Sequence, residues 1–206
     1  MILKARHHWF YYPFFQWYSR VMPKMDFREV HFHGKPEDKG LPILMIGNHF
    51  SWWDGFFALN INQVYFKRKF HIMMLEEQLK QRMMLNKTGA FSIKKGSRSM
   101  LESLNYAEEL LSEPGNMLVL FPQGSFQSIY DRPLVFEKGW FRIIEKASQP
   151  VQVVFFHALI DYFSHRKPSL HFYLYTHDYH NDDHASFENA FNRYYIESIE
   201  KQKSLK

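Results

Sequence analysis

Residues 42–59 read PILMIGNHFSWWDGFFAL, and they place a histidine and an aspartate just after a short apolar run. The run at 42–47 has no helical period, so it predicts a buried β-strand that ends just before His49. On a continuous helix, His49 and Asp54 would lie about 140° apart and could not touch. A turn must therefore separate them, and the S-x-x-D pattern predicts one, with Ser51 as the N-cap of a helix whose first turn contains Asp54.

That geometry gives the two side chains a chemical use. The Asp54 carboxylate can accept the proton of one imidazole nitrogen of His49, which leaves the other nitrogen free to act as a general base. The alternative is that Ser51 and Asp54 serve only to cap the helix, and that His49 is an ordinary loop residue. This segment alone favours neither interpretation.

The rest of the chain alternates apolar runs with amphipathic stretches, which predicts an α/β fold with a mixed, mostly parallel sheet covered by helices. We expect a single domain over residues 1–206, because this length suits one core and no linker or repeat interrupts it. The further strands are predicted at 66–75, 88–95, 116–121, 151–160 and 170–175, and the helices at 76–85, 97–111, 137–148 and 186–203.

An aromatic, amphipathic segment lies near the N-terminus. Residues 7–22, HHWFYYPFFQWYSRVM, hold eight aromatic residues between basic flanks, a composition suited to the lipid headgroup boundary. Pro13 is predicted to break this stretch into two short pieces. We expect residues 1–30 to contact the membrane surface, the alternative being an ordinary segment that covers the core.

Composition narrows the class of protein further. The net charge of +5 and the pI near 9.2 favour anionic partners. The chain has no cysteine, which excludes disulfides, thiolate metal sites and cysteine nucleophiles and fits a reducing compartment. No apolar run is long enough to span a bilayer, and no signal peptide is recognisable. We therefore expect a peripheral protein on the cytoplasmic face of the membrane.

Four segments occur in a suggestive order: NHFSWWD at 48–54, GAFSIKKG at 89–96, FPQGSF at 121–126 and PVQVV at 150–154. In sequence and spacing they resemble the four motifs of the glycerophospholipid (lysophosphatidic acid type) acyltransferases. Those motifs are N-H-x-S-x-x-D, a strand ending in a basic residue, F-P-E-G-T-R, and an apolar segment led by proline. The resemblance defines a motif-bearing core at residues 42–160.

This resemblance implies transfer of an acyl group from a coenzyme A or acyl-carrier-protein thioester to a hydroxyl of a lysophospholipid. His49 would be the general base and Asp54 its orienter, and no cofactor or metal would be needed. A thioester has a good leaving group, so an activated, positioned hydroxyl suffices without a covalent enzyme intermediate. The motifs also imply substrate-binding roles for Asn48, Ser51, Lys94, Lys95, Arg98, Pro122, Gln123, Gly124 and Ser125.

The chain departs from the family pattern at the acceptor site. Lys95 stands where the family usually has arginine, while Gln123 and Phe126 replace the glutamate and arginine of the third motif. A phenylalanine cannot bind phosphate. Either Lys94, Lys95 and Arg98 supply the positive charge, or the acceptor is not a simple lysophosphatidic acid. An amino-acid lipid or a pigment hydroxyl is therefore an alternative acceptor.

A non-catalytic basic module for membrane surfaces or nucleic acid is the alternative from another class. The aromatic residues, however, fall inside apolar strands and helices instead of alternating with Lys and Arg on one surface, so we expect no nucleic-acid partner. Residues 177–184, HDYHNDDH, have metal-compatible side chains, but their polar density is typical of a surface loop, and no metal site is expected. His157, inside an apolar strand, is predicted to be buried and hydrogen-bonded.

Overall fold

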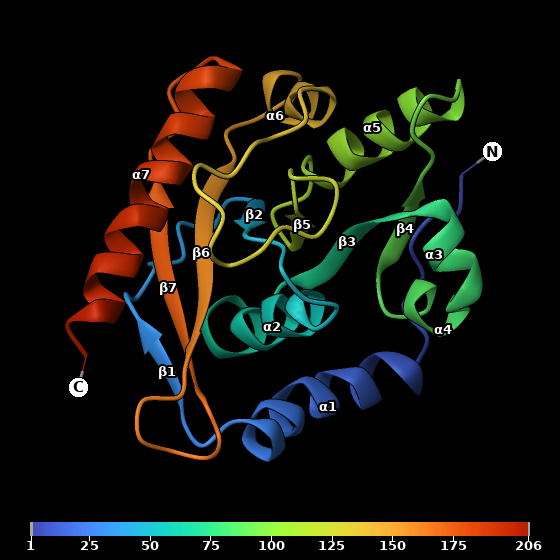
Figure 1. Ribbon diagram of the computed structural model, residues 1–206. Helices are drawn as coiled ribbons and strands as arrows, with labels where there is room; N and C mark the ends of the chain where they lie inside the picture. Colours follow the sequence, from blue (N-terminus) through green and yellow to red (C-terminus); the bar gives the residue numbers. More distant parts are fainter. Residues whose placement is uncertain (1, 206) are drawn as a thin grey trace.

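A seven-stranded sheet lies at the centre of the protein in the computed structural model, which describes residues 2–205 (Figure 1). The strands are β1 (Val30–His33), β2 (Ile43–Gly47), β3 (Lys69–Leu75), β4 (Ala90–Ile93), β5 (Asn116–Leu120), β6 (Gln152–Asp161) and β7 (Ser169–His177). Their order is β1-β7-β6-β2-β5-β3-β4, and only the pair β6–β7 is antiparallel. The predicted mixed, mostly parallel sheet is confirmed.

Helices cover both faces of this sheet because the central strands are apolar on both sides (Figure 1). Leu44 and Ile46 of β2 pack with residues of α5 and α7, whereas Ile43 and Met45 pack with residues of α1 and α2. The helices are α1 (Tyr11–Asp26), α2 (Asp54–Ile61), α3 (Glu76–Gln81), α4 (Met83–Asn86), α5 (Ser99–Leu110), α6 (Arg142–Glu145) and α7 (His184–Lys203), with a π-helical turn η1 (Asn62–Phe66) and a 3-10 turn η2 (Gly139–Phe141).

Two predicted helices and one strand that was not predicted differ from the structure. The helix predicted at 76–85 is interrupted at Arg82, between α3 and α4. The prediction at 137–148 was too long, since only η2 and α6 are helical there. The backbone N–H of Glu137 donates to the Pro122 carbonyl at 2.8 Å, which holds the start of the segment against the preceding loop. Pro150 disfavours helix at the residue before it, so the chain leaves the helix before β6. β1 was not predicted, because VHFH is no apolar run and all four residues are only partly buried.

The predicted break at Pro13 is wrong, since α1 is continuous through it. Pro13 lies in the first turn, where a backbone N–H would have no intrahelical partner in any case. Pro23 also lies within α1, and its missing N–H leaves the Ser19 carbonyl without its usual donor. The side chain of Asn60 on α2 donates to that carbonyl at 2.7 Å. The helix therefore tolerates both prolines.

Contacts with α2 and η1 fix α1 in place. Gln63 Nε2 donates to the Gln16 carbonyl and to Ser19 Oγ, each at 2.8 Å. The rings of Phe15 and Phe56 stack with their centroids 5.7 Å apart. No helix within residues 2–205 is both long enough and apolar enough to cross a membrane. The inner face of α1 thus packs against the core, while its outer face is exposed.

Candidate active site

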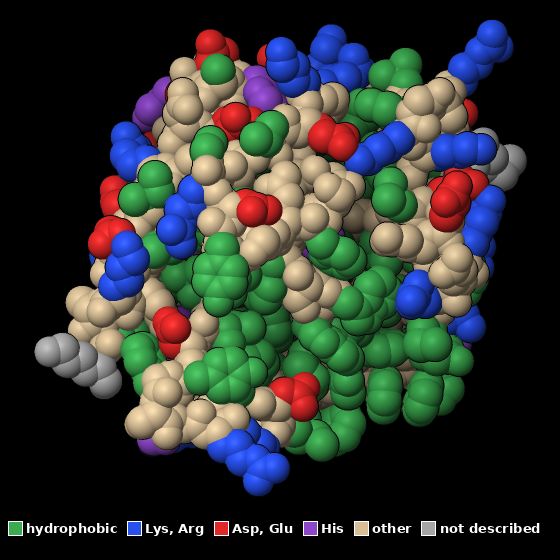
Figure 2. Space-filling model, in the orientation of Figure 1, with side chains coloured by type: hydrophobic (Ala, Val, Ile, Leu, Met, Phe, Trp, Pro, Cys, Tyr) green, Lys and Arg blue, Asp and Glu red, His purple; other side chains and the backbone are tan. Residues whose placement is uncertain are grey.

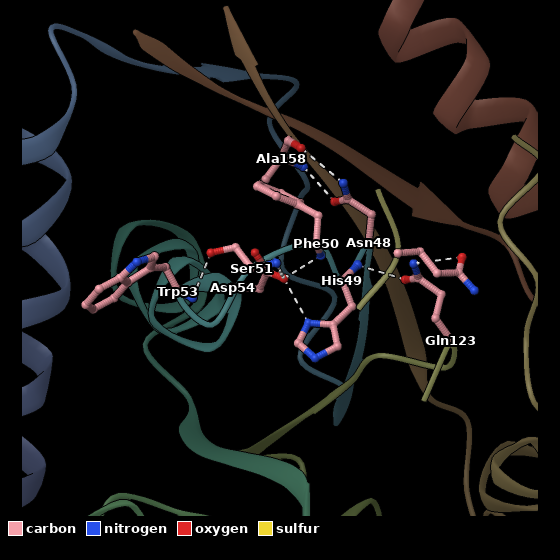
Figure 3. Close-up of polar contacts among 9 residues, drawn as sticks. Asn48, His49, Phe50, Ser51, Trp53, Asp54, Gln123 and Ala158 are labelled. Carbon is pink, nitrogen blue, oxygen red and sulfur yellow. Dashed lines mark hydrogen bonds and ion pairs between the residues drawn. The ribbon is translucent and has the colours of Figure 1, made fainter. Parts of the chain in front are cut away.

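The loop after β2 brings His49 and Asp54 together (Figure 3). β2 ends at Gly47 and α2 begins at Asp54, so the residues between them form a turn instead of a helix. His49 Nδ1 lies 2.8 Å from Asp54 Oδ2, within hydrogen-bonding distance. Gly47 is required at the strand end, because a Cβ there would lie 2.2 Å from the ring of Phe156. The predicted turn and the His–Asp contact are both present.

The Asp54 carboxylate is fully buried and anchors the whole loop. Besides His49 Nδ1, its Oδ2 accepts hydrogen bonds from the backbone N–H groups of Phe50 and Ser51, each at 2.9 Å. Burial raises the pKa of Asp54 above its usual value, while the hydrogen bonds from His49 and from the two N–H groups oppose that rise. The imidazole is therefore held by a carboxylate that the loop itself positions.

Ser51 is not the N-cap that the sequence predicted. Residue 53 precedes α2 directly, and Ser51 Oγ accepts from the backbone N–H of Trp53 at 3.0 Å, within the turn. The helix starts later than predicted, because the turn must fold back far enough for the Asp54 carboxylate to reach the Ser51 N–H. Ser51 thus shapes the loop, and it does not line the cavity beside His49.

Two side-chain amides, those of Asn48 and Gln123, fix the chain at and next to His49 (Figure 3). The Asn48 side chain exchanges hydrogen bonds with the backbone of Ala158 on β6, at 3.0 and 2.8 Å. Gln123 Oε1 accepts from the His49 N–H at 2.8 Å, and the Gln127 N–H donates to the His49 carbonyl at 2.8 Å. Asn48 and Gln123 are both buried and do not line the cavity. The structure assigns them to positioning His49, whereas the sequence predicted substrate contact.

A cavity of about 500 Å³ opens beside His49. Phe121 and Phe126 flank the imidazole, and the centroid of each ring lies 4.4 Å from it. Of the predicted site residues, Lys95, Pro122, Gly124 and Ser125 also line the cavity. The apolar part of the wall comes from α1, α2, β3, α4 and β4, through Phe15, Phe56, Leu59, Phe70, Ile72, Leu85, Ala90 and Ile93.

An ion pair lies at the polar end of this cavity. Lys95 Nζ donates to the Gly124 carbonyl at 3.0 Å and pairs with the carboxylate of Glu137. Lys94 and Arg98, predicted as substrate contacts, do not line the cavity. Sequence reasoning missed Glu137, because nothing in its local sequence sets it apart from an ordinary exposed residue before a helix. Only the folding of the loop after Phe121 brings it to Lys95.

The model of the acyltransferase family matches residues 29–157. The chain belongs to the acyltransferase family. This match includes all four motifs, the His49–Asp54 pair and the loop that carries Gln123. No curated protein sequence matches the chain.

The fold of this acyltransferase is similar to that of a solved relative. The crystal structure of PlsC, the 1-acyl-sn-glycerophosphate (LPA) acyltransferase from Thermotoga maritima, matches with a TM-score of 0.64 and 17% sequence identity. The match covers 94% of this chain and 80% of that chain. It therefore shows a shared overall architecture.

The histidine-rich segment before α7 holds no cluster suited to a metal. Within residues 2–205, no group of three or more His, Asp or Glu side chains is arranged to hold a metal ion. His177 Nε2 lies 2.8 Å from Asp182, and Asp183 caps α7 by accepting from the Ser186 N–H. His157 Nδ1 lies 2.9 Å from Ser198 Oγ and is fully buried, as the sequence predicted.

Replacing Gln123 with alanine is expected to lower both stability and activity. The partly buried His49 N–H would lose its acceptor, which costs about 1 kcal/mol in the free energy of unfolding. Gln123→Glu, which keeps an acceptor oxygen at this position, should retain most of the activity of the wild type. Thermal unfolding and the acyl-transfer rate of the two variants check this. If Gln123→Glu lost as much stability and activity as Gln123→Ala, a positioning role for the Gln123 oxygen would be contradicted.

Proposed function

We propose that the protein transfers an acyl group from an acyl thioester to a hydroxyl of a lysophospholipid-type acceptor. The observation that carries this proposal is the His49–Asp54 pair at the polar end of an apolar cavity large enough for an acyl chain. The donor is acyl-coenzyme A or acyl-carrier protein, and no cofactor is required.

His49 acts as the general base in this reaction. Its Nδ1 is occupied by Asp54, so Nε2 is the nitrogen that takes the proton of the acceptor hydroxyl. The hydroxyl oxygen attacks the thioester carbonyl, and the tetrahedral intermediate collapses with cleavage of the C–S bond. His49 then returns its proton to the leaving thiolate. Asp54 stabilises the transient imidazolium, as a buried carboxylate can.

The apolar cavity holds the acyl chain of the donor. Phe70 pairs in register with Met117, four residues before Phe121, so the cavity extends about 13 Å along the sheet from the edge that carries His49. Its wall includes Phe15 and Phe56, whose helices also form the apolar outer surface of the protein. An acyl chain can therefore lie between the sheet and α1, with its carbonyl at His49.

An exposed aromatic surface beside the cavity supports contact with a membrane. Figure 2 shows apolar side chains gathered over α1, α2 and α4. Trp9 and Trp17 are 81% and 57% exposed. Such a patch suits the headgroup boundary of a bilayer, and we propose that the protein binds there as a peripheral protein on the cytoplasmic face. The exposed members of this membrane face are Trp9, Phe10, Phe14, Trp17, Met25, Trp53, Met83 and Met84.

Removing the two tryptophans should weaken membrane binding. Trp9→Ser with Trp17→Ser is expected to lower the fraction bound to anionic phospholipid vesicles about tenfold or more, because two interfacial anchors are lost. Ile196→Ser, which changes an exposed apolar side chain on α7, is the matched control and should bind like the wild type. Co-sedimentation measures the bound fraction of both variants. If the double variant bound as well as the wild type, the proposed membrane contact through this face would be refuted.

Release of free thiol tests the proposed reaction directly. The chain has no cysteine, so any thiol that appears during turnover of acyl-coenzyme A comes from the donor. The rate should depend on added lysophospholipid, and mass spectrometry should find the corresponding ester. Parallel reactions with acyl-carrier protein identify the preferred donor. A rate of thiol release that does not depend on the acceptor would indicate a thioesterase instead of a transferase.

A further inference from the structure

The Lys and Glu side chains at the polar end of the cavity form a pair whose charges cancel. Among the described residues that line the cavity, Lys95 and Glu137 are the only ones with Lys, Arg, Asp or Glu side chains, and they pair with each other. Both are about half-exposed, so the pair can open, yet its charges still sum to zero. The site therefore presents one cation and one anion to any acceptor that reaches His49.

Gly124 shapes this ion pair. Its φ of +67° is in the left-handed region, and a Cβ there would lie 2.4 Å from Glu137 Oε1 and 2.6 Å from Lys95 Nζ. Lys95 Nζ also donates to the Gly124 carbonyl. The turn is thus built around the pair, and Lys95 is already engaged by two acceptors. A phosphate dianion binding Lys95 would have to compete with the Glu137 carboxylate and lie close to it.

The position beside the imidazole offers no compensating charge. Phe126 lies there, half-exposed, with its ring centroid 4.4 Å from that of His49. A phenyl ring donates no hydrogen bond to a phosphate oxygen. Lys94 of the second motif and Arg98 just after it lie outside the cavity wall. Among the described residues that line the cavity beside His49, none is therefore free to neutralise a doubly charged headgroup.

We infer that the acceptor is a lysolipid whose headgroup has no net charge, and that Lys95 and Glu137 together select it. This inference rests on the proposed function and specifies its acceptor. A zwitterionic headgroup would place its anion by Lys95 and its ammonium group by Glu137, and an uncharged hydroxylated headgroup would leave the pair intact. A phosphate monoester is disfavoured because like charges would be brought together at Glu137.

Competition among three acceptors tests this inference. Wild-type protein receives lysophosphatidylethanolamine, monoacylglycerol and lysophosphatidic acid at equal concentrations in neutral detergent micelles. One of the first two should be preferred about tenfold or more over lysophosphatidic acid. Glu137→Gln should shift this ratio toward lysophosphatidic acid about tenfold. Glu113→Gln, which removes the same charge at an exposed site away from the cavity, should leave the ratio unchanged.

The outcomes separate this inference from the proposed function. Preference of the wild type for lysophosphatidic acid, or an unchanged ratio in Glu137→Gln, would overturn the inference while acyl transfer stands. Absence of transfer to every acceptor would count against the proposed function. In that case the dissociation constants of the three lysolipids for the wild type still decide the headgroup question, with lysophosphatidic acid expected to bind most weakly.

Discussion

Replacing His49 with alanine should lower acyl transfer about 10²–10⁴-fold, the range that a positioned general base contributes. The variant removes the imidazole that we propose as the base, which lies between Phe121 and Phe126. Its fold should persist, because the imidazole is partly exposed and Asp54 keeps its two backbone donors. The thiol-release rate and the midpoint of thermal unfolding measure the two effects.

A matched variant distinguishes lost chemistry from lost structure. His180→Ala removes an exposed histidine far along the chain from the site and should keep full activity. If His49→Ala also kept full activity, general-base catalysis by this residue would be refuted. If it failed to fold, the loss of rate would carry no mechanistic meaning, and His49→Gln, which keeps a polar side chain of similar length, would replace it.

Asp54 variants should separate orientation from charge. In Asp54→Asn, the amide oxygen can still accept from His49 and from the N–H groups of Phe50 and Ser51, but it cannot stabilise an imidazolium. We expect a loss of about 10²-fold or more in kcat with a small change in KM. Asp54→Ala should lose at least as much activity and also unfold more easily, because two N–H groups lose their acceptor, at about 1–3 kcal/mol each.

The pH dependence of stability provides a second readout for Asp54. Burial raises the pKa of this carboxyl in the folded protein, so the folded state binds its proton more tightly than the unfolded chain does. The ionised group therefore costs stability, and this cost grows as the pH rises from the ordinary value of 3.8 through the raised pKa. Relative to Asp54→Asn, the wild type should lose stability over that window. A wild type that gains stability there would show that the hydrogen bonds outweigh burial.

The sequence predicted the sheet and the reactive pair because both are encoded locally. Apolar runs such as ILMIG have no helical period, and in the structure they are buried strands. His49 and Asp54 lie five residues apart, so a single turn decides whether they meet. The fold class, the family and the contact between these two side chains all followed from short segments.

Features that depend on distant contacts were missed. The continuity of α1 through Pro23 depends on Asn60, which supplies a donor from another helix. Glu137 meets Lys95 across 42 residues of sequence, and no local pattern indicates that pairing. The hydrogen bond from the His49 N–H to the Gln123 oxygen was not predicted either. In each case a side chain satisfies a group that only the tertiary fold brings near.

The most direct test of the central claim is mass spectrometry of the lipid product formed by wild-type protein and by His49→Ala. Each is given labelled acyl thioester and a mixture of lysolipids. The account predicts that the wild type forms a labelled ester of a lysolipid, that His49→Ala forms almost none, and that the intact protein gains no acyl mass. Equal ester formation by both proteins, or an acylated protein intermediate, would contradict direct transfer with His49 as the base.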